Sequence, residues 1–194
     1  LTNIVYMGMG EPFDNLNAVL DSLEILTSEW GFGMSPRRIT VSTIGVIPAM
    51  QEFLEKSSCH LAVSLHSPFE EERRRIMPIE KAYPLPQVLQ AIRNFPIGKQ
   101  RRVSFEYIVF KDLNHSPRHV KELARLLNGI RCRINLLRFH TVPGSPFVSP
   151  NETEMNAFKS ALEAKGIVTT IRKSRGQDIY AACGLLSTLN KTND

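Results

Sequence analysis

The chain has 194 residues, 42% hydrophobic and 22% charged, which is typical of a soluble globular protein. Three cysteines far apart in the sequence argue against a disulfide framework and favour a cytoplasmic protein. No apolar run approaches the roughly 20 residues of a membrane-spanning helix, so we expect no membrane partner. The net charge of +5 favours a polyanionic partner only mildly, and Leu1 in place of methionine suggests a piece of a longer chain.

Short β-rich runs alternate with amphipathic segments along the whole sequence. Most of these runs are continuously apolar, as strands covered on both faces are. The expected strands are 3–7, 38–42, 60–65, 102–110, 133–138 and 168–172. The expected helices are 16–26, 47–56, 85–94, 117–128 and a last one that runs from Ser149 or Asn151 to Gly166. We expect a charged turn at 70–75 and a loop at 143–150.

This alternation predicts an α/β fold in a single domain, 1–194. Strand–helix–strand units imply parallel strands joined by right-handed crossovers. Six such strands could form an open doubly wound sheet or part of a β/α barrel.

Polar side chains recur just after the expected strands, where β/α folds carry their working groups. The opening GMGEP places Glu11 after such a strand, with Gly10 allowing close backbone approach. A carboxylate there suits a cation such as an ammonium. The alternative is an acidic residue at a helix start, which the helix dipole favours.

Two histidines and one cysteine are further candidates. His66 and His140 each follow a strand, where they are either packed residues or members of a site. Cys183 follows a basic run that includes Arg172 and Arg175. Positive charge could lower the pKa of its thiol and make it a nucleophile, or it is a small buried helical residue. Cys59 and Cys132 precede strands, so we expect them in the core.

Charged runs at 71–78, 98–102 and 172–175, together with Arg37 and Arg38, have two interpretations. They are solvated faces, or they line a path for phosphate groups.

Five blocks of the sequence, MGMGEPFDNLNAV, GFGMSPRRITVSTIGVIPAM, LAVSLHSP, RINLLRFHTVPGSPF and IRKSRGQDIYAACG, occur in an order that resembles one family. They are similar to the radical S-adenosylmethionine (SAM) RNA methyltransferases over nearly the whole chain. That family methylates C2 of an adenine in 23S rRNA and, in some members, in tRNA. A sister group methylates C8 of the same rRNA adenine.

The resemblance implies a partial radical SAM (TIM-like) β/α barrel and names its site residues. Cys183 would be the cysteine that becomes methylated during the reaction. His140 stands where better-known members have an asparagine, and an imidazole can also make a hydrogen bond. The residues matching SAM contacts are Gly10, Glu11, Ser42, Ser64, Leu65, His66 and His140.

The resemblance also implies a [4Fe–4S] cluster and an electron donor for it. The family binds that cluster with a C-x-x-x-C-x-x-C loop, which does not occur in this sequence. The cysteine that resolves the RNA adduct by disulfide formation also lies upstream in the family. We therefore expect a barrel without its first strand and cluster loop, which has no metal ligands and is inactive alone. Its exposed edge strand would favour self-association.

Three functions stay open at this point. The chain is part of an RNA adenine methyltransferase acting at C2 or C8, or a radical SAM barrel that uses Cys183 on another substrate. The third alternative is a β/α scaffold that binds RNA without catalysis.

Overall fold

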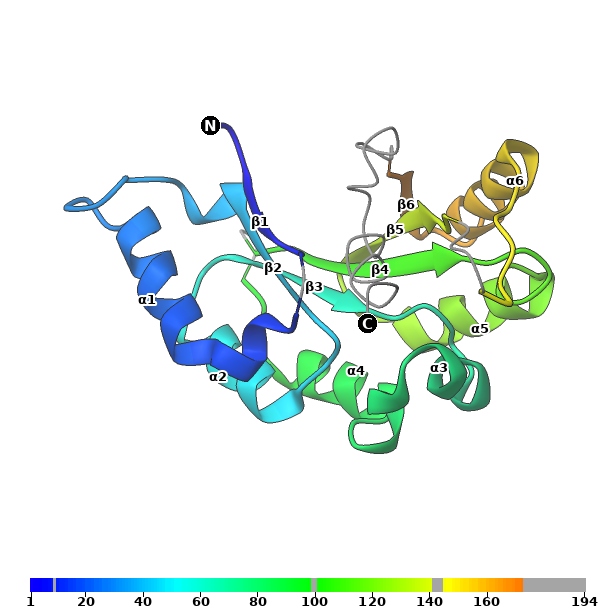
Figure 1. The fold of residues 1–194 in the computed structure, drawn as a ribbon, viewed down its shortest axis with the longest axis horizontal. Coiled ribbons are helices and arrows are strands. Elements are labelled where there is room, and N and C mark those ends of the chain that lie inside the picture. The colour runs from blue at the N-terminus through cyan, green and yellow to red at the C-terminus, as the bar shows by residue number, and fades with distance from the viewer. Residues whose placement is uncertain (9, 99–100, 141–144, 173–194) are drawn as a thin grey trace, which may run out of the picture.

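The computed structural model describes residues 1–8, 10–98, 101–140 and 145–172 (Figure 1). Within them the strands are β1 (Ile4–Tyr6), β2 (Ile39–Thr43), β3 (His60–Ser64), β4 (Val103–Val109), β5 (Cys132–Arg138) and β6 (Val168–Ile171). The α-helices are α1 (Leu16–Thr27), α2 (Ile47–Lys56), α3 (Glu70–Ile76), α4 (Leu85–Asn94), α5 (Pro117–Leu127) and α6 (Glu152–Glu163). Three short 3₁₀ helices, η1 (Pro12–Asn15), η2 (Pro36–Arg38) and η3 (Pro78–Lys81), complete the described elements.

The strands form one parallel sheet in the order β1-β2-β3-β4-β5-β6, and α-helices follow the strands along the chain. A doubly wound sheet reverses its strand order at a switch point, whereas a β/α barrel adds strands in sequence. The observed order therefore selects the barrel-type arrangement. The helices pack along one face of the curved sheet, and the other face is concave (Figure 1).

The sheet curves far enough for its two edge strands to approach each other. A hollow of about 280 Å³ on the concave face is lined by side chains from all six strands, including Val5, Ser104 and Thr170. Arg172, just after β6, donates from Nη1 to the sulfur of Met7, just after β1, at 2.9 Å. The described part of the chain is thus a partial barrel.

The core lies between the sheet and the helices. Alternate strand residues point to that side, so Val41, Leu61 and Phe105 are fully buried. They pack with helix residues such as Phe53 and Leu123 in one hydrophobic cluster. Burying each such side chain contributes about 1.5–3 kcal/mol. The continuous apolar runs in the sequence reflect this burial.

The expectation of a charged turn at 70–75 is wrong. Residues Glu70–Ile76 form the helix α3, with three acidic residues in its first turn and three basic residues in its last. That charge order complements the helix dipole and stabilises so short a helix. Arg73 on this helix is fully buried and pairs with Glu80, so it cannot belong to a phosphate path.

None of the described helices is long and apolar enough to cross a membrane.

Candidate functional site

The sequence-predicted site residues in the described part lie at one edge of the sheet. Because all six strands are parallel, their carboxyl ends meet at the same rim. Gly10 and Glu11 follow β1, and His140 follows β5. Ser42 and Ser64 lie near the carboxyl ends of β2 and β3. Because side chains two residues apart share a face of the sheet, both serines lie on the concave side. Thr40 and His60 on the same strands line the hollow there. Cys183 lies outside the described residues.

Glu11 is held by both of its carboxylate oxygens. Oε1 accepts from the backbone N–H of Phe13 at 3.0 Å and caps η1, while Oε2 accepts from the N–H of Ile44 at 2.7 Å. The interpretation of Glu11 as a helix-start residue is therefore confirmed, and the same side chain joins the loops after β1 and β2. An ionised carboxylate has about four acceptor positions, so Glu11 retains capacity for a further donor.

Gly10 makes the turn before Glu11 possible. Its φ of +99° lies in the region that favours glycine, and a Cβ built there would meet nothing within 4 Å. The half-buried Glu11 thus stands beside an open backbone position.

Leu65 is anchored by the fold. Its side chain is fully buried, its N–H donates to the Glu106 carbonyl at 2.9 Å, and its carbonyl accepts from Arg73 Nε at 3.1 Å. Arg73 Nη2 also donates to the carbonyls of Ser64 and Ile44 at 3.1 and 3.2 Å. One buried guanidinium therefore fixes the loops after β2 and β3. Contact between Leu65 and a ligand stays a prediction.

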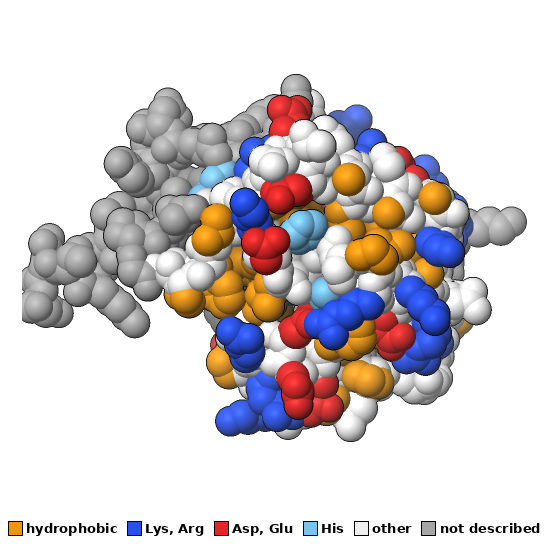
Figure 2. All heavy atoms as spheres, turned by 90° about the vertical axis from the view of Figure 1, so that its right-hand side faces the viewer, with side chains coloured by type: hydrophobic (Ala, Val, Ile, Leu, Met, Phe, Trp, Pro, Cys, Tyr) orange, Lys and Arg blue, Asp and Glu red, His pale blue; other side chains and the backbone are white. Residues whose placement is uncertain are grey.

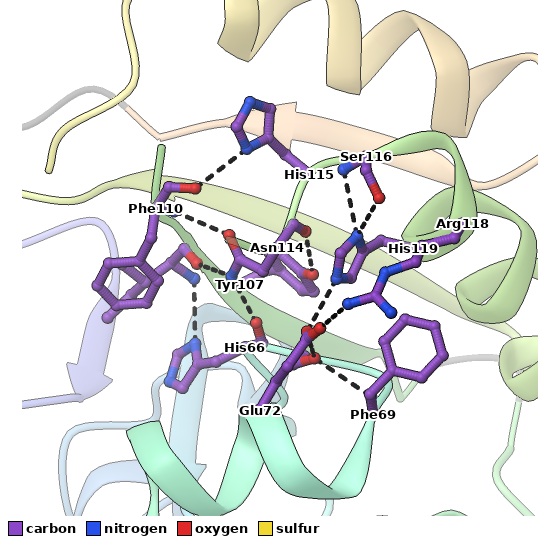
Figure 3. A network of polar contacts seen from close by, with 12 residues as sticks. His66, Phe69, Glu72, Tyr107, Phe110, Asn114, His115, Ser116, Arg118 and His119 are labelled. Carbon is purple, nitrogen blue, oxygen red and sulfur yellow. Dashed lines mark hydrogen bonds and ion pairs between the residues drawn. The ribbon is translucent and has the colours of Figure 1, made fainter. Parts of the chain in front are cut away.

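His66 lies in a buried polar network (Figure 3). Its Nδ1 accepts from the Ile108 N–H at 3.0 Å, and its carbonyl accepts from Asn114 Nδ2 at 2.6 Å. Burial, aided by the positive charge of Arg73, lowers the pKa of His66 to about 3. The ring is therefore neutral near pH 7.

The same network continues to Glu72 on α3 (Figure 3). Glu72 Oε2 accepts from His119 Nε2 at 2.8 Å and from Ser67 Oγ at 2.7 Å, and Oε1 accepts from Arg118. Burial lowers the pKa of His119, although Glu72 opposes the shift. These bonds join α3 to α5 directly beneath the rim.

The concave hollow is a cationic feature, and two of its arginines, Arg102 and Arg172, belong to the charged runs 98–102 and 172–175. Arg102, Arg133 and Arg172 all line it. Burial lowers the pKa of His60 there, and the charges of Arg102 and Arg133 lower it further. Burial raises the pKa of Glu106, whose Oε1 accepts from Asn135 Nδ2 at 2.7 Å.

The outer face over α3, α5 and α6 carries both signs of charge (Figure 2). Lys and Arg side chains lie there among Asp and Glu side chains (Figure 2). Arg118 of α5 pairs with Glu72 of α3, and Arg125 pairs with Glu122 within α5. In the 98–102 run, Arg101 bonds to the Leu54 carbonyl, so it stabilises the fold. The charged side chains of this face and Arg101 are therefore accounted for by ion pairs and hydrogen bonds within the fold, and they give no support to a path for phosphate groups.

Cys59 and Cys132 are free thiols at the amino ends of β3 and β5. Burial raises the pKa of Cys59 and raises that of Cys132 to about 11. Cys59 is buried as expected, and Cys132 is half-buried. Across the residues that the structure describes, no group of three or more His, Cys, Asp or Glu residues could hold a metal ion.

A sequential parallel half-barrel with polar strand ends is the architecture of radical SAM enzymes, and a solved structure supports that class. The chain superposes on a radical SAM methyltransferase from Sphaerobacter thermophilus with a TM-score of 0.89 and 42% identity, covering 95% of this chain and 55% of that one. A domain of pyruvate-formate lyase-activating enzyme from Bacteroides vulgatus shares the fold, with a TM-score of 0.66 and 17% identity over 89% of this chain and 100% of that one. No family model matches the chain.

Relatives found by sequence narrow the class to RNA methyltransferases. The chain is 59% identical over 97% of its length to a probable dual-specificity RNA methyltransferase RlmN from Porphyromonas gingivalis, covering 55% of that protein. It is 46% identical over 95% of its length to a dual-specificity RNA methyltransferase RlmN from Nautilia profundicola, covering 52% of it. The chain is therefore a relative of the radical SAM RNA methyltransferases, as the motifs indicated, and it spans about half the length of the curated relatives it matches.

Proposed function

We propose that this chain is part of a radical SAM enzyme that methylates an adenine in RNA. The proposed substrate is the C2 position of an adenine in 23S rRNA, with tRNA as a second substrate, and the reaction proceeds through methylated Cys183. The observation that carries the proposal is the 59% identity, over nearly the whole chain, to a protein named as a dual-specificity RNA methyltransferase. In this proposal residues 1–194 are the C-terminal part of the barrel domain.

The rim residues have the chemistry that SAM requires. Glu11 offers acceptor capacity for the ammonium group of SAM, next to the open backbone of Gly10. The hydroxyls of Ser42 and Ser64 and the ring of His66 can donate to its carboxylate, ribose or adenine. When bound, SAM supplies the methyl group and, together with a reduced cluster, radical chemistry. His140, whose pKa burial lowers, is a further proposed contact.

Cys183 is the proposed methyl carrier. Its thiolate sulfur attacks the methyl carbon of SAM, and the bond from that carbon to the sulfonium breaks, which leaves S-adenosylhomocysteine. Methyl transfer to a cysteine is chemically reasonable because C2 of adenine is not nucleophilic. The basic residues Arg172, Lys173 and Arg175 precede it in the sequence. Positive charge close to a thiol favours the thiolate.

The described residues do not fit a [4Fe–4S] cluster, since they bring no set of three ligands together. The cluster and its electron donor belong to the full-length enzyme. The cytoplasm, where rRNA and tRNA occur, is its proposed location.

The test uses the full-length protein and mass spectrometry of methylated RNA. Cys183→Ala is expected to abolish methyl transfer while SAM still binds, whereas Cys132→Ala retains activity because that thiol lies at the opposite ends of the strands. Undiminished RNA methylation by Cys183→Ala would falsify the role of Cys183. A methyl group found on C8 would assign the enzyme to the sister group instead.

Glu11→Gln in the same protein tests the SAM site. Loss of the charge facing the ammonium should weaken SAM binding about tenfold or more, because hydrogen bonds to charged groups contribute about 1.5–3 kcal/mol. Isothermal titration calorimetry measures this change. An unchanged dissociation constant would leave Glu11 as a capping residue alone.

A further inference from the structure

His66 adopts a strained backbone conformation. Its φ of 58° lies in the left-handed region, which is costly for a residue with a Cβ and persists only where the surroundings hold it. In the described part of the chain, Asp112 is the one other non-glycine residue with positive φ. The two strained residues lie in the loops after β3 and β4, and Asn114 joins these loops.

Asn114 is fully buried and uses every hydrogen-bonding group of its side chain (Figure 3). Nδ2 donates to the carbonyls of His66 and Ile108 at 2.6 and 2.7 Å, and Oδ1 accepts from the Phe110 N–H at 2.8 Å. Its own carbonyl accepts from the Tyr107 hydroxyl at 2.5 Å. Since no other amino acid of this size has two N–H donors and an acceptor, the requirement at this position is specific.

The same contacts determine which nitrogen of His66 carries the proton. A backbone N–H can only donate, so the bond from Ile108 to Nδ1 requires an unprotonated Nδ1. The neutral ring therefore carries its hydrogen on Nε2. The low pKa of His66 agrees with this neutral form.

The other ring nitrogen, Nε2, takes no part in this network. It has no hydrogen-bond partner among the described residues, and His66 as a whole is 8% exposed. In Figure 3 this nitrogen points away from the network around Asn114. The ring thus presents one N–H outward and no acceptor.

We propose that Asn114 is a positioning residue which, together with the Ile108 amide, holds His66 as an obligate hydrogen-bond donor to an acceptor atom of SAM. The proposal rests on the proposed function, which supplies SAM as the ligand. It divides the recognition of SAM between two groups. Glu11 is an acceptor suited to the ammonium, whereas His66 can meet only the carboxylate, a ribose oxygen or an adenine nitrogen.

The first measurement needs no variant. Two-bond ¹H–¹⁵N correlation spectra of the full-length protein, labelled at histidine and prepared without iron, report which ring nitrogen is protonated. His66 is expected as the Nε2–H form at neutral pH. His115 is an internal control with the opposite form, because its Nδ1 lies 3.0 Å from the Phe110 carbonyl, which can only accept. An Nδ1–H form of His66, or a charged ring at pH 7, overturns the proposal.

A double-mutant cycle tests whether Asn114 acts through His66. In the cluster-loaded full-length protein, Asn114→Ala and His66→Phe should each weaken SAM binding about three- to tenfold, which corresponds to the loss of one hydrogen bond. The double variant should bind no more weakly than His66→Phe alone. Additive losses would show that Asn114 acts independently and would overturn the positioning role. Asn128→Ala, at the end of α5, is the matched control and should change nothing.

The outcomes separate the two proposals. If the wild-type protein does not bind SAM, the proposed function fails, and the ligand named here fails with it. The tautomer of His66 is decided by the spectra in either case. If Asn114→Ala does not fold, His66→Phe and the wild-type spectra decide the donor role, since an unchanged SAM affinity in His66→Phe contradicts it.

Discussion

Arg73 is the residue on which the loops after β2 and β3 depend most directly. It is a fully buried cation that donates to Glu80 and to the carbonyls of Ile44, Ser64 and Leu65. Breaking a buried pair leaves one charge uncompensated, which costs about 3–5 kcal/mol.

Arg73→Leu is therefore expected to lower the free energy of unfolding by about 3–5 kcal/mol, measured by urea denaturation. Arg74→Leu is the adjacent control. Its ion pair with Glu70 is exposed, so its loss should cost no more than about 1 kcal/mol. Equal effects of the two variants would contradict a special role for the buried pair.

The sequence could not distinguish these two neighbouring arginines. Both lie in the run EEERRR, and the partner of Arg73, Glu80, belongs to the next short helix. Asn114 is similar, because its side chain contacts both β4 and the loop after β3, which only the folded chain brings together. Motifs point to candidate ligand contacts, whereas the residues that hold these candidates in place are visible only in three dimensions.

At the scale of elements, the sequence was informative because the strand residues that face the helices are apolar and buried, as Val41, Leu61 and Phe105 are. All six expected strands are present, and the expected helices at 47–56 and 85–94 have the bounds Ile47–Lys56 and Leu85–Asn94. The helix α3 was missed because its seven residues are mostly charged. The order of its charges, acidic first and basic last, was the available signal.

Helix α6 allows a test of capping at this scale. Asn151 Oδ1 accepts from the Glu154 N–H at 2.8 Å, and Glu154 Oε2 accepts from the Asn151 N–H at 2.7 Å. Asn151→Ala should lower the free energy of unfolding by about 1 kcal/mol, because the backbone N–H of Glu154 loses its partner. Asn156→Ala, an exposed substitution in the middle of the same helix, should not destabilise, since alanine is the better helix former. Thermal and urea unfolding of both variants check this difference.

For the whole molecule, the important feature is the open side of the partial barrel. Among the described residues, β1 pairs only with β2 and β6 only with β5, so each leaves one edge of the sheet unpaired. The concave face between them carries three arginines around one hollow. Parallel strands joined by right-handed crossovers could be expected from the alternation of strands and helices. The strand order could not, because the same alternation also fits a doubly wound sheet. The degree of curvature could not, because it depends on packing across all six strands.

The unpaired edge of β1 predicts self-association of the 194-residue chain. An exposed strand edge offers free N–H and C=O groups to a second chain. Val5, in the middle of β1, is 51% exposed. Sedimentation velocity should therefore show a mass that rises with concentration above the 21.9 kDa of one chain. Val5→Lys should reduce this association, because a charged side chain on an edge strand disfavours pairing. Val148→Lys is the matched control: Val148 is 56% exposed but lies in a loop, so the same added charge should leave the association intact. An equal reduction by both variants would assign the effect to net charge, and a wild-type chain that stays monomeric would show that the β1 edge is covered in solution.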